Sequence, residues 1–238
     1  GQTLPQQQTT SDAATGEFDF QDLVPGTYTV TETLPPEWGT STGLTVSNIV
    51  VTSGIEWVAF SGQADLPLDS PKTEQILDEN PQDSIPDLAF GNYIFGSIHG
   101  IKYEDQNGNG VQDPGDDPVG GVVFALTGVD AAGQTIPQQQ TTSDPATGEF
   151  DFQDLVPGTY TVTETLPPEW GTSTGLTVSN IIVTSGIEWV AFGGQADLPI
   201  DSPKTEQLLD QNPQDSIPDL AFGNYIFGSI HGIKYEDP

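Results

Sequence analysis

Alternating apolar and polar residues predict a series of short strands along this chain. Residues 148–153 read GEFDFQ, which places Phe150 and Phe152 on one face of a strand. Residues 159–165 read TYTVTET and alternate in the same way. Turn signals rich in Gly and Pro separate these segments at short intervals, which favours a β-sandwich. Further strands are predicted at 96–104, 121–127, 134–142, 176–183, 187–192 and 220–226.

One stretch departs from this strand pattern. Residues 194–218 are rich in Pro, Asp, Gln and Ser and predict a long surface loop, with a short helix at 205–210. This loop is the candidate region for contacts with neighbouring domains or with an unknown surface ligand.

The charge balance restricts the partners of the chain. There are 35 acidic and four basic residues, and the net charge is −31. Such a chain repels nucleic acid and anionic lipid, so we expect neither partner, whereas cation binding is favoured. Cysteine is absent, which excludes disulfides, thiolate metal sites and a cysteine nucleophile. No apolar run approaches the roughly 18 residues of a membrane span, so no membrane insertion is expected in this segment.

Residues 105–116 read DQNGNGVQDPGD and fit a twelve-residue calcium loop of the EF-hand type. Such a loop supplies oxygen ligands at positions 1, 3, 5, 7, 9 and 12 and has Gly at position 6, here Gly110. The predicted Ca²⁺ ligands are Asp105, Asn107, Asn109, the Val111 carbonyl, Asp113 and Asp116.

Position 12 of the loop departs from the usual Glu. Asp116 is one methylene shorter than Glu, and the neighbouring Asp117 could replace it as a ligand. The alternative is an Asn-Gly-rich turn without an ion. Because predicted strands flank the loop, we expect a structural calcium site within a β domain and not a helix-opening sensor.

An internal repeat organises the whole sequence. Residues 1–106 align without gaps to residues 133–238, with a period of 132 and eight differences. Near-identity of this kind is typical of structural arrays, in which each copy is one packing unit.

The repeat and the strand pattern together predict three parts. Residues 1–94 form a sandwich repeat without its first strands and calcium loop, and residues 95–226 form a complete repeat with the loop at 105–117. Residues 227–238 supply the first strand of a further repeat. We interpret the chain as a window from a longer array. The alternative is a subunit whose last strand completes the amino-terminal domain of the next subunit, head to tail.

The combined motifs resemble the SdrD B-like repeat domains of bacterial surface adhesins, which are related to collagen-adhesin B-type (Cna-B) domains. The resemblance covers nearly the whole period except roughly residues 183–218. The matching residues are Gly96-Ser97-Ile98, Gly100, Asp105 to Asp113, Gly120-Gly121-Val122, Thr147-Gly148-Glu149-Phe150, Phe152, Leu155, Pro157-Gly158, Tyr160, Val162, Glu164-Thr165 and Phe222-Gly223-Asn224.

This resemblance implies tandem prealbumin-like or Ig-like Greek-key sandwiches, with calcium bound between the first two strands. It also implies a stalk or spacer role outside the cell. Some Cna-B relatives join a Lys of the first strand to an Asn of the last strand, assisted by a Glu. By resemblance the candidates here are Lys102, Asn224 and Glu164. The alternative for Lys102 is a pairing with surface acids, with Ile101 and Tyr103 on the inward face.

No catalytic arrangement is visible, so we predict that the chain is not an enzyme. Each period has one His, His99 or His231, in the strand segment Ser-Ile-His-Gly, and we expect a solvated surface position for both. No Ser-His-Asp arrangement and no phosphate-binding Gly loop accompanies them. Packing is preferred over sugar binding for the four tryptophans, Trp38, Trp57, Trp170 and Trp189.

Three functions remain open at this level. The first is a structural repeat of an extracellular stalk, fibre or filament at the cell surface, rigidified by calcium and contacting neighbouring copies. The second is the subunit of a strand-exchanged, head-to-tail polymer. The third is a ligand-binding adhesin module.

Overall fold

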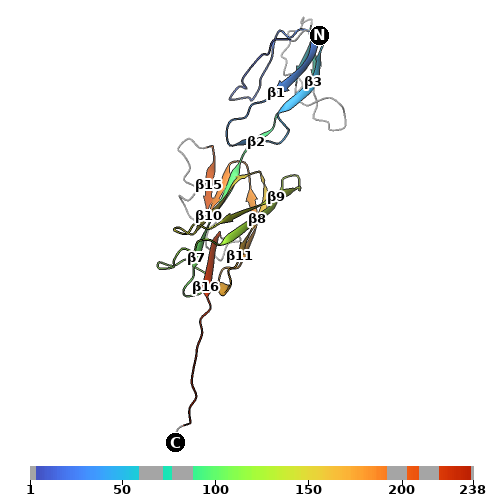
Figure 1. Ribbon diagram of the computed structural model, residues 1–238. Helices are drawn as coiled ribbons and strands as arrows, with labels where there is room; N and C mark the ends of the chain where they lie inside the picture. Colours follow the sequence, from blue (N-terminus) through green and yellow to red (C-terminus); the bar gives the residue numbers. More distant parts are fainter. Residues whose placement is uncertain (1–3, 59–71, 77–87, 192–202, 209–219, 237–238) are drawn as a thin grey trace. The chain divides into compact units, whose positions relative to one another are not determined.

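The computed structural model of this chain describes residues 4–58, 72–76, 88–191, 203–208 and 220–236. Every regular element in these ranges is a strand, which confirms the all-β prediction (Figure 1). The chain forms two compact units. Unit 1 comprises Gly1–Leu34 and Thr40–Gly91, and unit 2 comprises Pro35–Gly39 and Asn92–Pro238.

Unit 2 contains a sandwich of two sheets (Figure 1). The first sheet consists of β12 (Trp170–Thr172), β16 (Ala221–Ile226), β7 (Gly96–Glu104), β14 (Ile187–Val190), β15 (Thr205–Leu208) and β10 (Glu149–Leu155). The second has the order β13 (Thr177–Val183), β11 (Gly158–Thr165), β8 (Val123–Asp130) and β9 (Thr135–Thr142). Successive strands from β9 to β14 alternate between the sheets, as expected for the predicted Greek-key sandwich.

An aromatic cluster joins the inward faces of the two sheets. Phe124 and Phe150 stack with ring centroids 3.8 Å apart, and Phe222 meets both rings edge-on. Phe150 and Phe152 are each 2% exposed, so the predicted inward face of β10 is confirmed. Burial of a side chain of this kind stabilises a fold by about 1.5 to 3 kcal/mol, which makes the cluster a principal link between the sheets.

Strand β7 pairs with three other strands and is buried from Gly96 to Tyr103. It runs antiparallel to β10 and parallel to both β14 and β16. Glycine permits the close approach of these neighbours, because a Cβ at Gly100 would lie 2.1 Å from Cζ of Phe150. The predicted bounds of this strand are confirmed.

Residues 205–208 form strand β15, so the helix predicted at 205–210 is wrong for the residues that are described. β15 pairs in parallel with β14, and the sheet supplies partners for its backbone groups. An isolated helical turn would have to offset a costly nucleation step with few hydrogen bonds. The rest of the predicted loop, apart from residues 203–208, lies outside the described residues. The short strand β12 was not predicted.

Unit 1 repeats part of this fold. β1 (Gly26–Thr31) pairs with β3 (Thr45–Val51) in the same register as β11 with β13. β4 (Ile55–Val58) pairs in parallel with β5 (Thr73–Ile76), as β14 does with β15. The short strands β2 (Trp38–Thr40) and β6 (Asn92–Ile94), most of whose residues belong to unit 2, form a separate two-stranded sheet.

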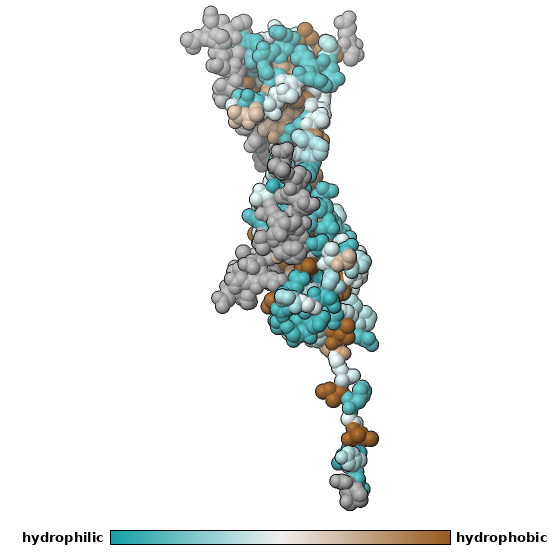
Figure 2. All heavy atoms as spheres, turned by 90° about the vertical axis from the view of Figure 1, so that its left-hand side faces the viewer, coloured by the Kyte–Doolittle hydropathy of each residue, from teal (hydrophilic) through white to brown (hydrophobic). Residues whose placement is uncertain are grey.

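Residues 228–236 have the sequence of β7 but belong to no strand. Ile230 is 100% exposed, whereas its counterpart Ile98 is 0% exposed. Tyr235 is 77% exposed and Tyr103 is 0% exposed. Figure 2 shows hydrophobic residues open to solvent along this segment. Because the two sequences are identical, the burial of β7 must come from its neighbouring strands and not from local propensity.

His99 is buried, so the surface position predicted for it is wrong, whereas His231 is exposed. Glu188 of the neighbouring strand β14 lies against the His99 ring, so the outward face of β7 is covered there, and the alternation within β7 does not show this. The Nε2 atom of His99 lies 2.8 Å from Oγ of Ser97 and 3.9 Å from Oε2 of Glu188. Glu188 in turn pairs with Nζ of Lys204 at 3.0 Å.

We predict that His99 makes the stability of unit 2 fall in mild acid. Burial lowers the pKa of His99 below its ordinary value of 6.5; Glu188, Asp151 and Glu149 oppose this shift, and Lys204 adds to it. The unfolded chain therefore binds this proton more tightly than the folded chain. The stabilisation is complete above the unfolded pKa and is lost as the pH falls through the folded pKa.

Denaturant unfolding at a series of pH values measures this effect. His99→Gln should flatten the loss of stability below about pH 6.5, the ordinary histidine pKa. His231→Gln changes an exposed histidine in the same tetrapeptide and should keep the loss. Parallel pH profiles for all three proteins would contradict the prediction.

Candidate functional site

The predicted calcium loop connects β7 to β8 and is organised around Asp105. Asp105 is fully buried, and its carboxylate accepts hydrogen bonds from the backbone N–H groups of Gly108 and Gly110, both at 2.7 Å. Both glycines have positive φ, 71° and 79°, a region that is unfavourable for other residues. The Gly at position 6 is therefore needed to turn the backbone onto this carboxylate.

The remaining predicted side chains converge on Asp113. Nδ2 of Asn107 and Nδ2 of Asn109 donate to the same oxygen, Oδ2 of Asp113, at 2.7 and 2.8 Å. Oδ2 of Asp116 accepts the backbone N–H of Asp113 at 2.9 Å. Five of the predicted ligand side chains thus lie in one hydrogen-bonded loop.

The two other predicted ligands lie at the edge of this network. Val111 is 46% exposed, and its N–H donates to Oδ1 of Asn109 at 2.8 Å. Asp117 is exposed, and its carbonyl accepts the N–H of Glu104 at 2.8 Å.

Asp105 is held in its ionised form. Burial raises its pKa, but hydrogen bonds from the Ser173 side chain and from the N–H groups of Gly110, Gly108 and Asn109 bring the pKa below the ordinary value of 3.8. Ser173 could not be predicted from the loop motif, because it lies on a separate part of the chain, next to β12.

The donor set of the loop fits a hard divalent cation. It combines three carboxylates with two amides, which are the oxygen ligands that Ca²⁺ prefers. The two amide N–H groups already bring positive partial charge to Asp113, where a cation would act. The described residues hold no group of three His, Cys, Asp or Glu side chains arranged for a metal, so amide and backbone oxygens would have to complete the shell.

A second cluster lies beside the loop, between the two sheets. Lys102 of β7, Glu164 of β11 and Asn224 of β16 are 0%, 3% and 0% exposed. Nδ2 of Asn224 donates a short hydrogen bond to Oε1 of Glu164. Nζ of Lys102 donates to the carbonyls of Tyr103 and Phe222 at 2.7 and 2.9 Å. The alternative of a surface pairing for Lys102 is therefore wrong.

Burial shifts both ionisable groups of this cluster towards neutrality. It lowers the pKa of Lys102 to about 8, although the charges of Glu164, Glu104 and Asp105 act in the opposite direction. It also raises the pKa of Glu164, against the effects of Lys102 and of the hydrogen bond from Asn224. A neutral amine and a protonated acid beside an amide are the groups required for amide exchange.

Two atoms of the cluster have no hydrogen-bond partner, Oε2 of Glu164 and Oδ1 of Asn224, and both are buried. An unsatisfied buried polar atom costs about 1 to 3 kcal/mol of folding free energy, so this arrangement destabilises the fold if its role is only structural. The cluster and the loop are directly connected, since the N–H of Asp105 donates to the carbonyl of Asn224 at 2.7 Å.

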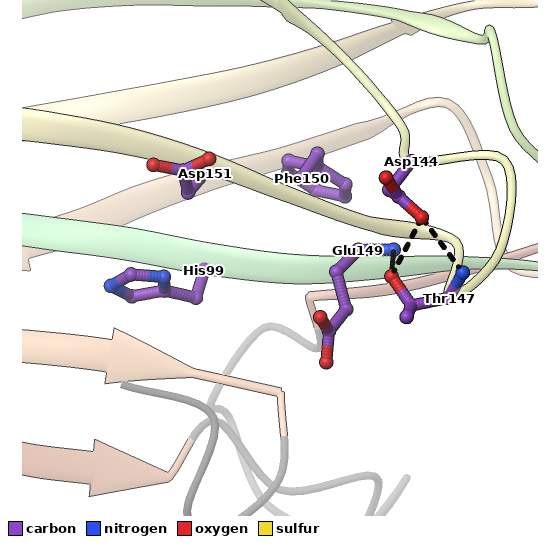
Figure 3. Close-up of a pocket in the computed structure, with 6 residues that line it drawn as sticks. All are labelled: His99, Asp144, Thr147, Glu149, Phe150 and Asp151. Atoms are coloured by element: carbon purple, nitrogen blue, oxygen red, sulfur yellow. Dashed lines mark hydrogen bonds between the residues drawn. The ribbon is translucent and has the colours of Figure 1, made fainter. Parts of the chain in front are cut away.

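A hollow of about 340 Å³ lies beside His99. His99 and Asp151 face it from the paired strands β7 and β10, and Asp144 accepts hydrogen bonds from Thr147 at its rim (Figure 3). Ser97 and Glu188 both approach Nε2 of His99, whereas a proton relay needs them on different ring nitrogens. Ser97 is also fully buried, so it is not placed to attack a substrate.

The described residues contain no helix that is long and apolar enough to cross a membrane. Trp57 and Trp189 pack against the cores of their units, in agreement with a packing role.

Comparison with known proteins identifies one part of the chain. Residues 96–193 match the family model of the SdrD B-like domain. Colossin-A of Dictyostelium discoideum is 26% identical over 162 residues, which cover 68% of this chain and only 1% of the length of Colossin-A. The full-length major pilin SpaD of Corynebacterium diphtheriae is similar over 56% of this chain and 32% of the pilin, with 17% identity and a TM-score of 0.31.

The family match covers β7, the loop and the strands through β14, which is the segment that carries most of the sequence motifs. The resemblance drawn from those motifs is therefore confirmed, since residues 96–193 match the model of the SdrD B-like domain.

Proposed function

We propose that the complete repeat is a structural module of an extracellular stalk, fibre or filament, rigidified by calcium. The SdrD B-like match of residues 96–193 carries this proposal, because it assigns the domain to a family of surface-protein modules. The near-identical second copy supports it, since arrays of one module suit a spacer better than a specific catalyst.

A non-enzymatic role is part of the proposal. The buried groups that could do chemistry, His99 and Lys102, are 8% and 0% exposed, so a diffusing substrate cannot reach them readily. The hydrogen bonds of Lys102 end on the chain's own backbone carbonyls. Any reaction at Lys102 would therefore modify the protein itself.

Calcium would be held by the side chains of Asp105, Asn107, Asn109, Asp113 and Asp116, with the Val111 carbonyl and Asp117 completing the shell. Its positive charge would offset the repulsion between carboxylates gathered on one loop. Because Asp105 bonds to β16 through the carbonyl of Asn224, an ordered loop would also hold the end of β7 against β16.

The second cluster supports an internal covalent bond between Lys102 and Asn224. In this step the neutral amine of Lys102 attacks Cγ of Asn224, a new C–N bond forms, and the bond from Cγ to Nδ2 breaks. Protonated Glu164 gives its proton to the departing nitrogen, which leaves as ammonia, and its carboxyl takes up the proton that the amine loses, so Glu164 ends the step protonated. The shared burial of the three side chains and the contact of Asn224 with Glu164 support these roles.

Strand exchange is a second candidate, and residues 228–236 favour it. They carry the β7 sequence with Ile230 and Ile233 at 100% and 88% exposure. Another repeat that offers strands equivalent to β10, β14 and β16, in the same chain or in another copy, would bury them. The adhesin alternative stays a prediction, since most of residues 194–218, which would carry a ligand site, are outside the described residues.

We predict that calcium raises the melting temperature of the chain and that a chelator lowers it. A ligand that binds only the folded state stabilises it by about 2.7 kcal/mol at a hundredfold excess over its Kd. Thermal unfolding in calcium and in excess chelator measures the shift. Asp113→Ala should abolish it, while Asp19→Ala removes the same charge from an exposed site outside the loop and should retain it. Superimposable curves for the unchanged chain would refute the proposal.

The cross-link makes a prediction about mass. The intact chain should be lighter than its sequence by one ammonia, and Lys102→Ala or Asn224→Ala should restore the full mass. Lys72→Ala changes a lysine outside the cluster and should keep the deficit. By the chain-entropy model used for disulfides, losing a link across a loop of this length costs about 4 to 5 kcal/mol of unfolding free energy. An unchanged chain of full sequence mass, after prolonged incubation above pH 8, would exclude the bond.

Strand exchange predicts assemblies larger than the 25.3 kDa chain in sedimentation velocity. The double variant Ile230→Asp with Ile233→Asp should be unable to insert its segment into an apolar core and should lose these assemblies. Val24→Asp with Leu44→Asp adds the same charge at exposed apolar positions of unit 1 and should retain them. Assemblies that persist in the first double variant would rule out this candidate.

A further inference from the structure

The outward face of the second sheet of unit 2 carries no charged side chain. We call it the threonine face. The register of the four strands aligns its residues in rows, for example Thr135, Val129, Thr159 and Ile182. Its members are Val123, Ala125, Thr127, Val129, Thr135, Gln140, Thr142, Thr159, Thr161, Thr163, Thr165, Thr177 and Ile182.

This lack of charge is unusual for the molecule. The chain carries a net charge of −31, and the outward side of the other sheet includes Glu149 and Asp151 on β10. On the threonine face, by contrast, Val129 and Ile182 are 41% and 59% exposed. These two residues flank Thr159 in one row, so they form an apolar band across β8, β11 and β13. Figure 1 shows β8, β9 and β11 in one layer.

We propose that the threonine face is a lateral interface, through which it packs on the same face of a second copy of this chain. The occupant follows from the charge distribution. Two chains of this acidity repel wherever their carboxylates come close together. At physiological salt, charges less than about 8 Å apart are only partly screened from each other. Two threonine faces bring no carboxylates together, and a patch that pairs with itself is the normal arrangement about a two-fold axis.

The chemistry of the face suits sheet-on-sheet packing. Two sheets stack face to face about 10 Å apart, a distance that medium-sized side chains such as Thr and Val fill well. Each threonine also supplies a hydroxyl that can donate and accept, so polar atoms at the interface find partners. A charged residue in the middle of such a face would be buried without a partner.

The size of the face sets the strength of the contact. Four strands about 4.8 Å apart and up to eight residues long, at about 3.4 Å per residue, give roughly 500 Å² on each copy. The pair would then bury roughly 1,000 Å², below the 1,200 to 2,000 Å² of stable interfaces. A single repeat should therefore associate weakly.

Repetition strengthens this contact. Unit 1 carries the counterpart residues Thr27, Thr29, Thr31, Thr45 and Val50, which are exposed and again uncharged. When several weak faces lie on one chain, each contact raises the effective concentration for the next. The inference goes beyond the proposed stalk function, since it assigns a bundling surface to the module.

Sedimentation equilibrium of the full chain tests the proposal. The Ile230→Asp, Ile233→Asp background is used throughout, so that strand exchange cannot contribute. The weight-average mass should rise from 25.3 kDa towards twice that value with concentration, and more steeply at high salt, where repulsion elsewhere is screened. Thr161→Glu and Ile182→Asp should each weaken the association roughly tenfold or more, because like charges would face each other.

Gln153→Glu is the matched control, since it adds one negative charge to an exposed position of β10 in the other sheet. It should leave the association unchanged. A chain that stays monomeric at every concentration and salt level overturns the proposal, as does association that survives both face variants. Neither result bears on calcium binding or on the internal bond, which are read from melting curves and intact mass.

Discussion

The burial of β7 by three neighbouring strands is the constraint on which the rest of unit 2 depends. Its residues touch β10, β14 and β16, and through Phe150 and Phe222 they reach the aromatic core. The identical segment at 228–236 shows what the sequence does without those neighbours, because there its isoleucines are exposed. Strand propensity alone therefore does not form this element, which needs pairing with its three neighbouring strands. Gly100 permits part of this packing, because it has no Cβ to clash with the ring of Phe150.

The same burial explains why the polar residues of β7 are chemically unusual. A lysine and a histidine on this strand lose their contact with water when the sheet forms, and desolvation disfavours their charged forms. The pKa of Lys102 falls to about 8 and that of His99 also falls. Nearby carboxylates partly offset this effect, because Glu164 raises the pKa of Lys102 and Glu188 raises the pKa of His99. The lowered pKa values of Lys102 and His99 thus have one physical origin, the burial of both side chains.

Much of this fold could be predicted from the sequence, because alternation in half-buried strands such as β10 and β11 reports directly on which face is inward. The calcium ligands could be proposed from spacing alone, since they all lie within one short segment, and the structure gathers five of their side chains in one hydrogen-bonded loop. His99 could not be placed in this way, because the side chain beside its ring, Glu188 of β14, is distant from it in the sequence. β15 and Ser173 depend on contacts between distant parts of the chain, for which one sequence contains no local pattern.

The charge distribution sets what a copy of this module can contact. Carboxylates lie in the loop between β7 and β8 and on the outward side of β10, so close approach of another acidic chain there requires a cation or meets repulsion. The sheet of β13, β11, β8 and β9 presents hydroxyls, methyl groups and two exposed aliphatic residues instead. In this strongly acidic protein the face is neutral because its outward positions hold no Asp or Glu. Threonine, which occupies many of these positions, is uncharged and also favours strands. Solubility and lateral contact are therefore assigned to different sheets of the same sandwich.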